Sequence, residues 1–124
     1  MLLCIDDDGL ILGAVSRIFR GAAVASCIAD GVALAARLRP AVILVDLTLG
    51  DESGLDAIPM LLHVSPESKV IVFTARTNND LRRMSYAAGA VAFVDKMHLS
   101  RLREVVHDIV TAPSRPTGKK AALH

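Results

Sequence analysis

The stretch MLLCIDDD, residues 1–8, places four apolar residues after the initial Met directly before three carboxylates. A short, unbroken apolar run of this kind is typical of a buried β-strand. Asp6, Asp7 and Asp8 then lie where the strand ends, and nothing in the segment neutralises their mutual repulsion. The stretch therefore predicts a strand over residues 2–5 whose end carries concentrated negative charge.

Four more apolar runs of strand length follow this one. Apart from Ser26, they contain no alternating polar residues. Unbroken apolar strands are typical of a parallel sheet that is covered by helices on both faces. The five expected strands are Leu2–Ile5, Val24–Ile28, Val42–Val45, Val70–Phe73 and Val91–Val94.

Segments with apolar residues at helical spacing separate the expected strands. In the first of them, Ile11, Ala14, Val15 and Ile18 recur at intervals of three and four. Strands that alternate with helices through short links form a doubly wound α/β sheet with right-handed crossovers. We therefore expect a flavodoxin-like (βα)5 fold with strand order 2-1-3-4-5. The expected helices cover residues of about 11–18, 31–39, 55–62, 78–88 and 99–109.

The composition indicates one domain and excludes several classes of protein. The 124 residues are 52% hydrophobic, which is enough to bury a core. A net charge of +1 gives no whole-chain basis for binding nucleic acid or an anionic membrane, and no apolar run spans a bilayer. Cys4 and Cys27 lie in apolar segments, so we expect buried, reduced thiols in a cytoplasmic protein. We expect the domain at residues 1–112 and a flexible tail or linker stub at 113–124.

Polar side chains follow the other strands at the edge where such sheets bind ligands. Asp46 follows the third expected strand, Thr74 the fourth and Lys96 is close behind the fifth. Asp8 precedes the first helix and is expected to cap it. Acids, a hydroxyl and an amine should therefore converge on one edge of the sheet.

These side chains have a common chemical use. Asp6, Asp7 and Asp46 form an all-oxygen anionic site, and Mg²⁺ is the cation that matches it best. Lys96 and the Thr74 hydroxyl remain as an ammonium group and a hydrogen-bond donor. A phosphoryl group on an aspartate needs this set, because its oxygens must be neutralised and held. The pattern predicts a metal site beside an aspartate that accepts phosphate.

From residue 1 to about residue 111 the sequence resembles a bacterial two-component response-regulator receiver domain. That family has an acidic pair after the first strand, an aspartate after the third, Thr or Ser after the fourth and Lys after the fifth. Gly54 lies eight residues after the aspartate, as in the family, and AAGAVAFVDK at residues 87–96 is similar to another family motif. The matching residues are Asp6–Asp7, Asp46, Thr74 with Ala75, and Lys96.

The resemblance implies a role for each matching residue. Asp46 would accept the phosphoryl group. Asp7 and Asp46 would bind Mg²⁺, or Mn²⁺ in its place, directly, and Asp6 would bind it through water. The backbone carbonyl of Thr48 would be a further ligand. Thr74, Ala75 and Lys96 would contact the phosphoryl group, and Thr74 and Phe93 would form the switch.

The resemblance also implies partners and an output. A histidine kinase or phosphotransfer protein would donate the phosphoryl group. The chain would catalyse only its own phosphorylation and dephosphorylation, so it is not expected to be an enzyme with a separate substrate. The fourth helix, fifth strand and fifth helix would form the output surface, with Arg82, Arg83 and Arg101 as candidate contacts. We expect control of transcription through a DNA-binding effector domain outside this sequence, and the resemblance also allows a homodimer that forms on phosphorylation.

Two residues near the site depart from the family pattern. Gly50 stands where the family commonly has Pro, so the loop after Asp46 should be more flexible. Met97 stands where Pro commonly follows the lysine, so the bond between Lys96 and Met97 should be trans. In the family, positions such as Thr48 and Arg76 tune hydrolysis of the phosphoaspartate.

Two other functions remain open at this point. One is a receiver-like interaction module that acts without phosphorylation. The other is a Mg²⁺-dependent phosphatase with an aspartate nucleophile, but such enzymes carry a second Asp where this chain has Thr48. A dinucleotide site is excluded, because DDDGLILGAV after the first strand lacks the G-x-G-x-x-G pattern.

Overall fold

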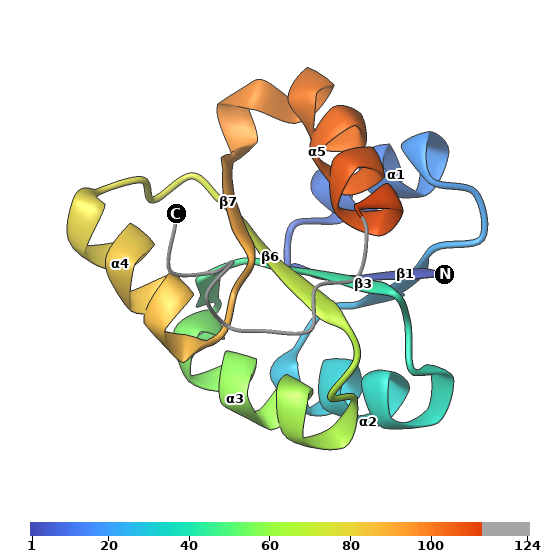
Figure 1. The fold of residues 1–124 in the computed structure, drawn as a ribbon, viewed down its shortest axis with the longest axis horizontal. Coiled ribbons are helices and arrows are strands. Elements are labelled where there is room, and N and C mark those ends of the chain that lie inside the picture. The colour runs from blue at the N-terminus through green and yellow to red at the C-terminus, as the bar shows by residue number, and fades with distance from the viewer. Residues whose placement is uncertain (113–124) are drawn as a thin grey trace.

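A computed structural model describes residues 1–112 and places five parallel strands in one sheet (Figure 1). The strand order is β2-β1-β3-β6-β7, which confirms the expected 2-1-3-4-5 order of a flavodoxin-like fold. The expected tail at 113–124 lies outside the described residues. The strands of the sheet are β1 Leu2–Ile5, β2 Ala23–Ala25, β3 Val42–Val45, β6 Lys69–Thr74 and β7 Ala92–Asp95.

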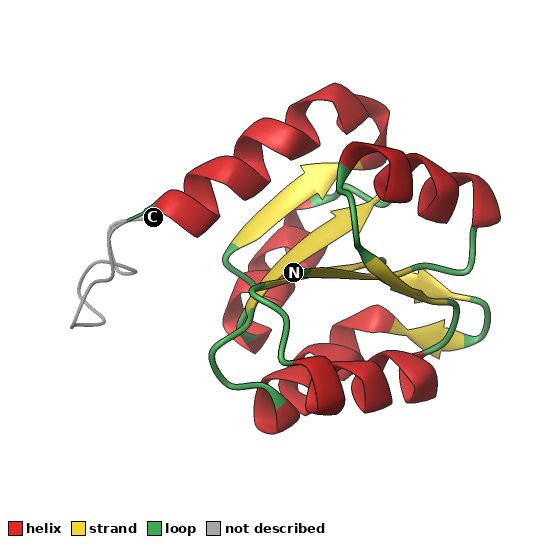
Figure 2. Ribbon diagram, turned by 90° about the vertical axis from the view of Figure 1, so that its right-hand side faces the viewer, coloured by secondary structure: helices red, strands yellow, loops and turns green. Residues whose placement is uncertain are grey.

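Helices cover both faces of this sheet, as the unbroken apolar strands predicted (Figure 2). Figure 1 shows α1 and α5 on one face and α2, α3 and α4 on the other. A short 3₁₀ turn, η1 Lys96–His98, joins β7 to α5. The helices are α1 Gly9–Ile18, α2 Ile28–Leu38, α3 Gly54–Val64, α4 Asn79–Ala88 and α5 Leu99–Thr111.

Successive strand residues pack into two separate cores, one on each face of the sheet. Leu3 and Ile5 belong to the core under α2 and α3, whereas Leu2 and Cys4 belong to the core under α1 and α5. Both sets are almost completely buried. This alternation explains why every position of a central strand is apolar.

The expected second strand, Val24–Ile28, is wrong at its end. β2 stops at Ala25, Cys27 is the N-cap of α2, and Ile28 is the first residue of that helix. Ile28 is 9% exposed because it packs into the core from the first turn of α2. A short apolar run alone does not distinguish a strand from the start of a buried helix.

A small hairpin between β3 and α3 was not predicted. In it, β4 Thr48–Leu49 pairs antiparallel with β5 Glu52–Ser53. Gly50 has a φ of +62°, a conformation that favours glycine and allows the tight turn. The greater flexibility expected from Gly50 stays a prediction.

Two local expectations are confirmed. The Asp8 carboxylate accepts a 2.9 Å hydrogen bond from the backbone N–H of Leu10 and so caps α1. The bond between Lys96 and Met97 is trans, as are all peptide bonds within residues 1–112.

Within residues 1–112, no helix combines the length and hydrophobicity that crossing a membrane requires.

The two cysteines are both free, but their environments differ. Cys4 is buried as expected, whereas Cys27 is only half-buried. Burial is the main influence on Cys4 and, together with the charge of nearby Asp6, raises the pKa of its thiol to about 12. The thiolate is the reactive form, so Cys4 should be unreactive in the folded protein.

A disulfide reagent at pH 8 is therefore expected to modify one thiol in the native protein and two after unfolding. Counting the released chromophore measures this directly. Cys27→Ser should leave no reactive thiol in the native state. Rapid modification of Cys4 in that variant would contradict its burial.

Candidate functional site

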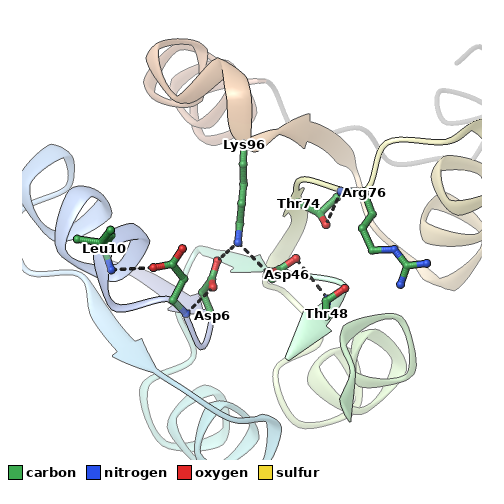
Figure 3. A network of polar contacts seen from close by, with 8 residues as sticks. Asp6, Leu10, Asp46, Thr48, Thr74, Arg76 and Lys96 are labelled. Atoms are coloured by element: carbon green, nitrogen blue, oxygen red, sulfur yellow. Dashed lines mark hydrogen bonds and ion pairs between the residues drawn. The ribbon is translucent and has the colours of Figure 1, made fainter. Parts of the chain in front are cut away.

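The register of β1 and β3 places the acidic residues that follow them side by side at one edge of the sheet. Ile5 pairs with Val45 across β1 and β3, so Asp6 and Asp46 follow at adjacent positions. Lys96 follows β7, an edge strand, and its side chain extends toward Asp6 and Asp46 (Figure 3). The predicted convergence on one edge of the sheet is therefore present.

Three carboxylates form a cluster at this edge. Asp6, Asp7 and Asp46 each offer an oxygen, and these oxygens lie within 4.8 Å of one another. Asp6 is 1% exposed and Asp46 is 6% exposed, while Asp7 faces solvent. Hard divalent cations with oxygen ligands and retained waters suit such a set, because the open side at Asp7 leaves room for water. The donor set therefore fits Mg²⁺.

Lys96 joins two of these carboxylates. Its Nζ lies 2.7 Å from Oδ2 of Asp6 and 2.8 Å from Oδ2 of Asp46 (Figure 3). One ammonium group thus compensates part of the charge of two buried acids, which would otherwise be costly to ionise. The pair Lys96–Asp46 is also the contact expected between an acceptor and a phosphoryl-binding amine.

The ionisation of these groups reflects burial and pairing. Burial is the strongest influence on Asp6 and raises the pKa of its carboxyl, although the hydrogen bond from Lys96 acts in the opposite direction. Burial alone would lower the pKa of Lys96. The hydrogen bonds to Asp46 and Asp6 outweigh that effect, so the pKa of the ammonium is raised. Lys96 therefore remains charged at neutral pH.

The backbone around Asp46 is held closely. The N–H of Thr48 donates to Oδ1 of Asp46 at 3.3 Å, and the N–H of Gly54 donates to the carbonyl of Leu47 at 2.9 Å. The Gly54 backbone lies so near that a Cβ there would be 1.7 Å from the Asp46 carbonyl oxygen. Gly54, singled out by its spacing, is thus the residue that lets α3 begin against the backbone that follows β3.

Thr74 is the last residue of β6, and Ala75 follows it. The Thr74 side chain is completely buried, and its oxygen accepts a 3.2 Å hydrogen bond from the backbone N–H of Arg76. Its own hydroxyl hydrogen is therefore free to be donated elsewhere. Ala75 is exposed directly after it, and Thr48, which begins β4, is also exposed.

Phe93 lies on β7 and is 8% exposed. The guanidinium of Arg82, from α4, is stacked over its ring at 4.7 Å from the centroid. Arg82 and Arg101 also line a pocket of about 410 Å³ next to Phe93, whereas Arg83 forms an ion pair with Asp80 on the surface. The sequence singled out these arginines but gave no sign of the stacking on Phe93.

Comparison with known proteins identifies the family. The chain matches the response regulator receiver domain over residues 2–107. It is 34% identical over 99 residues to the acid tolerance regulatory protein ActR of Sinorhizobium medicae, covering 77% of this chain and 51% of ActR. It is 31% identical over 101 residues to the response regulator GacA of Pseudomonas aeruginosa, covering 77% of this chain and 47% of GacA. This chain thus spans about half the length of the curated relatives it matches.

Solved structures agree with this assignment. A response regulator from Thermotoga maritima is 28% identical, with a TM-score of 0.78 and coverage of 90% of this chain and 97% of that one. A response regulator protein from Burkholderia pseudomallei, solved with a phosphorylated aspartic acid, calcium ion and citrate, is 26% identical. Its TM-score is 0.78, with coverage of 98% of this chain and 72% of that one. The sequence match and the shared architecture lead to the same conclusion: this chain belongs to the response regulator receiver domain family.

Proposed function

We propose that the chain accepts a phosphoryl group on Asp46 from a histidine kinase or phosphotransfer protein, in a reaction that depends on Mg²⁺. The observation that carries this proposal is the position of Lys96 Nζ, within hydrogen-bond distance of both Asp46 and Asp6. A nearly buried carboxylate with an ammonium group at one oxygen and an acidic cluster beside it suits phosphoryl transfer.

In the proposed reaction a carboxylate oxygen of Asp46 forms a bond to phosphorus, and the bond from phosphorus to the donor atom breaks. Lys96 lies beside Oδ2 of Asp46 and would neutralise the oxygens of the transferred group. The free hydroxyl hydrogen of Thr74 and the backbone at Ala75 would hold another oxygen. Asp6, Asp7, Asp46 and the Thr48 carbonyl would hold Mg²⁺, which supplies positive charge to the same oxygens when bound.

The signal would then pass to the face formed by α4, β7 and α5. Thr74 and Phe93 are the proposed switch, and Phe93 contacts Arg82 on that face. A shift of Thr74 toward the phosphoryl group would alter the packing of Phe93 and therefore the position of Arg82. Arg82 and Arg101 line the same pocket and are the proposed partner contacts.

The proposed output is transcription, through an effector domain outside this chain. This chain spans about half of ActR and of GacA, so the rest of each of those proteins has room for an effector domain. Three further expectations stay predictions: Mn²⁺ can replace Mg²⁺, phosphorylation leads to a homodimer, and the protein is cytoplasmic.

One labelling experiment separates the proposed function from its alternatives. The protein is incubated with Mg²⁺ and a small acyl phosphate, and the product is analysed by intact-mass spectrometry. A receiver forms one acid-stable, base-labile adduct on Asp46. An interaction module forms no adduct, and a phosphatase releases phosphate from many donors with continued turnover.

Mg²⁺ is expected to raise the melting temperature of the protein. Binding relieves the repulsion among Asp6, Asp7 and Asp46 and occurs only in the folded state. At about ten times the dissociation constant, linkage adds about 1.4 kcal/mol, or about 3–6 °C for a domain of this size. Thermal melts with increasing Mg²⁺ measure the shift, and a double Asp6→Asn, Asp7→Asn variant should lose it. An unchanged melting temperature at millimolar Mg²⁺ would count against the site.

A further inference from the structure

One side chain joins the hairpin after Asp46 to helix α2. Oε1 of Glu52 accepts a hydrogen bond of 3.1 Å from the backbone N–H of Ile28, the first residue of α2. The first N–H groups of a helix have no acceptor within the helix, and the N-cap Cys27 makes no side-chain hydrogen bond. Glu52 therefore supplies the missing cap from a position 24 residues away.

The same hairpin carries the groups that surround the acceptor. Thr48 pairs with Ser53 and Leu49 pairs with Glu52 across the two short strands. The N–H of Thr48 in turn donates to the Asp46 carboxylate. A contact that holds β5 in place therefore also holds β4, and with it the amide and the carbonyl of Thr48.

Charge and packing favour this arrangement. A carboxylate at the N-terminus of a helix interacts favourably with the partial positive charge there. Leu47 and Leu49 are buried in the same core as Ile28, so the hairpin already lies against the start of α2. At the hairpin turn, a Cβ on Gly50 would lie 3.8 Å from Oδ2 of Asp7. The hairpin thus extends from the cap of α2 to the acidic cluster.

We propose that Glu52 is a positioning residue that fixes the β4–β5 hairpin on α2 and so keeps Asp46 and the Thr48 carbonyl arranged for a divalent cation. This inference rests on the proposed function, because it assigns a use to the same metal site. Glu52 acts through the backbone of the hairpin and does not itself bind the metal.

Titration calorimetry with Mg²⁺ alone, without a phosphodonor, tests the proposal. Glu52→Ala is expected to weaken Mg²⁺ binding about threefold to tenfold, the range that follows from loss of one hydrogen bond. Glu52→Gln keeps an acceptor oxygen and should stay within about twofold of the wild type. Asp51→Ala is the matched control, since it removes one charge from the exposed neighbouring residue and should also leave binding nearly unchanged.

Hydrogen exchange of the metal-free protein gives a second readout. The amide of Ile28 should exchange faster in Glu52→Ala than in the wild type and at an unchanged rate in Asp51→Ala. If Glu52→Ala does not fold, Glu52→Asp replaces it, because Asp keeps the charge but shortens the side chain. Glu52→Asp should then show both weaker Mg²⁺ binding and faster exchange of the Ile28 amide.

Two results would overturn the inference. One is wild-type Mg²⁺ affinity in Glu52→Ala, or in Glu52→Asp if that variant replaces it. The other is an equal loss of affinity in Glu52→Gln and Asp51→Ala, which would mean that charge alone matters. Neither measurement uses a phosphodonor, whereas the labelling experiment on the wild type does. An inference about Glu52 that fails while the wild type still gains an adduct on Asp46 therefore leaves the proposed function standing.

Discussion

Asp46→Asn is expected to reduce phosphoryl labelling to background while leaving the fold intact. An amide oxygen is a poor nucleophile, and the nearby acids Asp6 and Asp7 lie beside residue 46 and would not take its place. Removing one of three clustered negative charges also lessens repulsion, although the ion pair with Lys96 is lost. We therefore expect the metal-free variant to be as stable as the wild type or slightly more so, because Lys96 keeps Asp6 as its partner.

Labelling with an acyl phosphate and intact-mass analysis measure the first effect, and thermal melts measure the second. Asp51→Asn is the control for general loss of charge near the site. It should label like the wild type. An adduct of normal yield on Asp46→Asn would move the acceptor to another residue.

Gly54→Ala is expected to destabilise the protein by about 3 kcal/mol or more. The new Cβ would lie 1.7 Å from the carbonyl oxygen and 2.7 Å from the carbonyl carbon of Asp46. Both atoms belong to the backbone, so no side-chain rotation relieves the clash. Either α3 or the backbone of Asp46 must shift, and Mg²⁺ binding should weaken together with stability.

Gly13→Ala provides a control in which the same substitution should increase stability. Gly13 lies within α1, and the nearest atom to its Cβ would be 3.9 Å away, in the flexible side chain of Arg17. Alanine should therefore stabilise the helix by about 0.5–1 kcal/mol. Denaturant titrations compare the two variants. Near-wild-type stability of Gly54→Ala would contradict the close packing of α3 on Asp46.

The parts of the fold that follow from local patterns were predictable. Continuous apolar strands and helical spacing predicted the order of the sheet, and the acids after β1 and β3 predicted the cluster. Asp6, Asp46 and Lys96 come together because parallel strands end at one edge, which is a property of topology rather than of side-chain detail.

Features that depend on tertiary packing were not predictable from local patterns. Ile28 looked like a strand residue because its apolar character is shared by strands and buried helix starts. The contacts of Glu52 with Ile28 and of Arg82 with Phe93 join residues from different elements. Nothing in the spacing of these residues along the chain signals either contact.

The amine of Lys96 has a consequence for how information crosses the molecule. It directly follows β7, an edge strand of the sheet, whereas both of its anionic partners directly follow interior strands, β1 and β3. A group attached to Asp46 would compete for the same ammonium, and Lys96 lies in the short turn that leads into α5. Acetylation of Lys96 would remove its positive charge and leave Asp6 and Asp46 without their shared counter-ion.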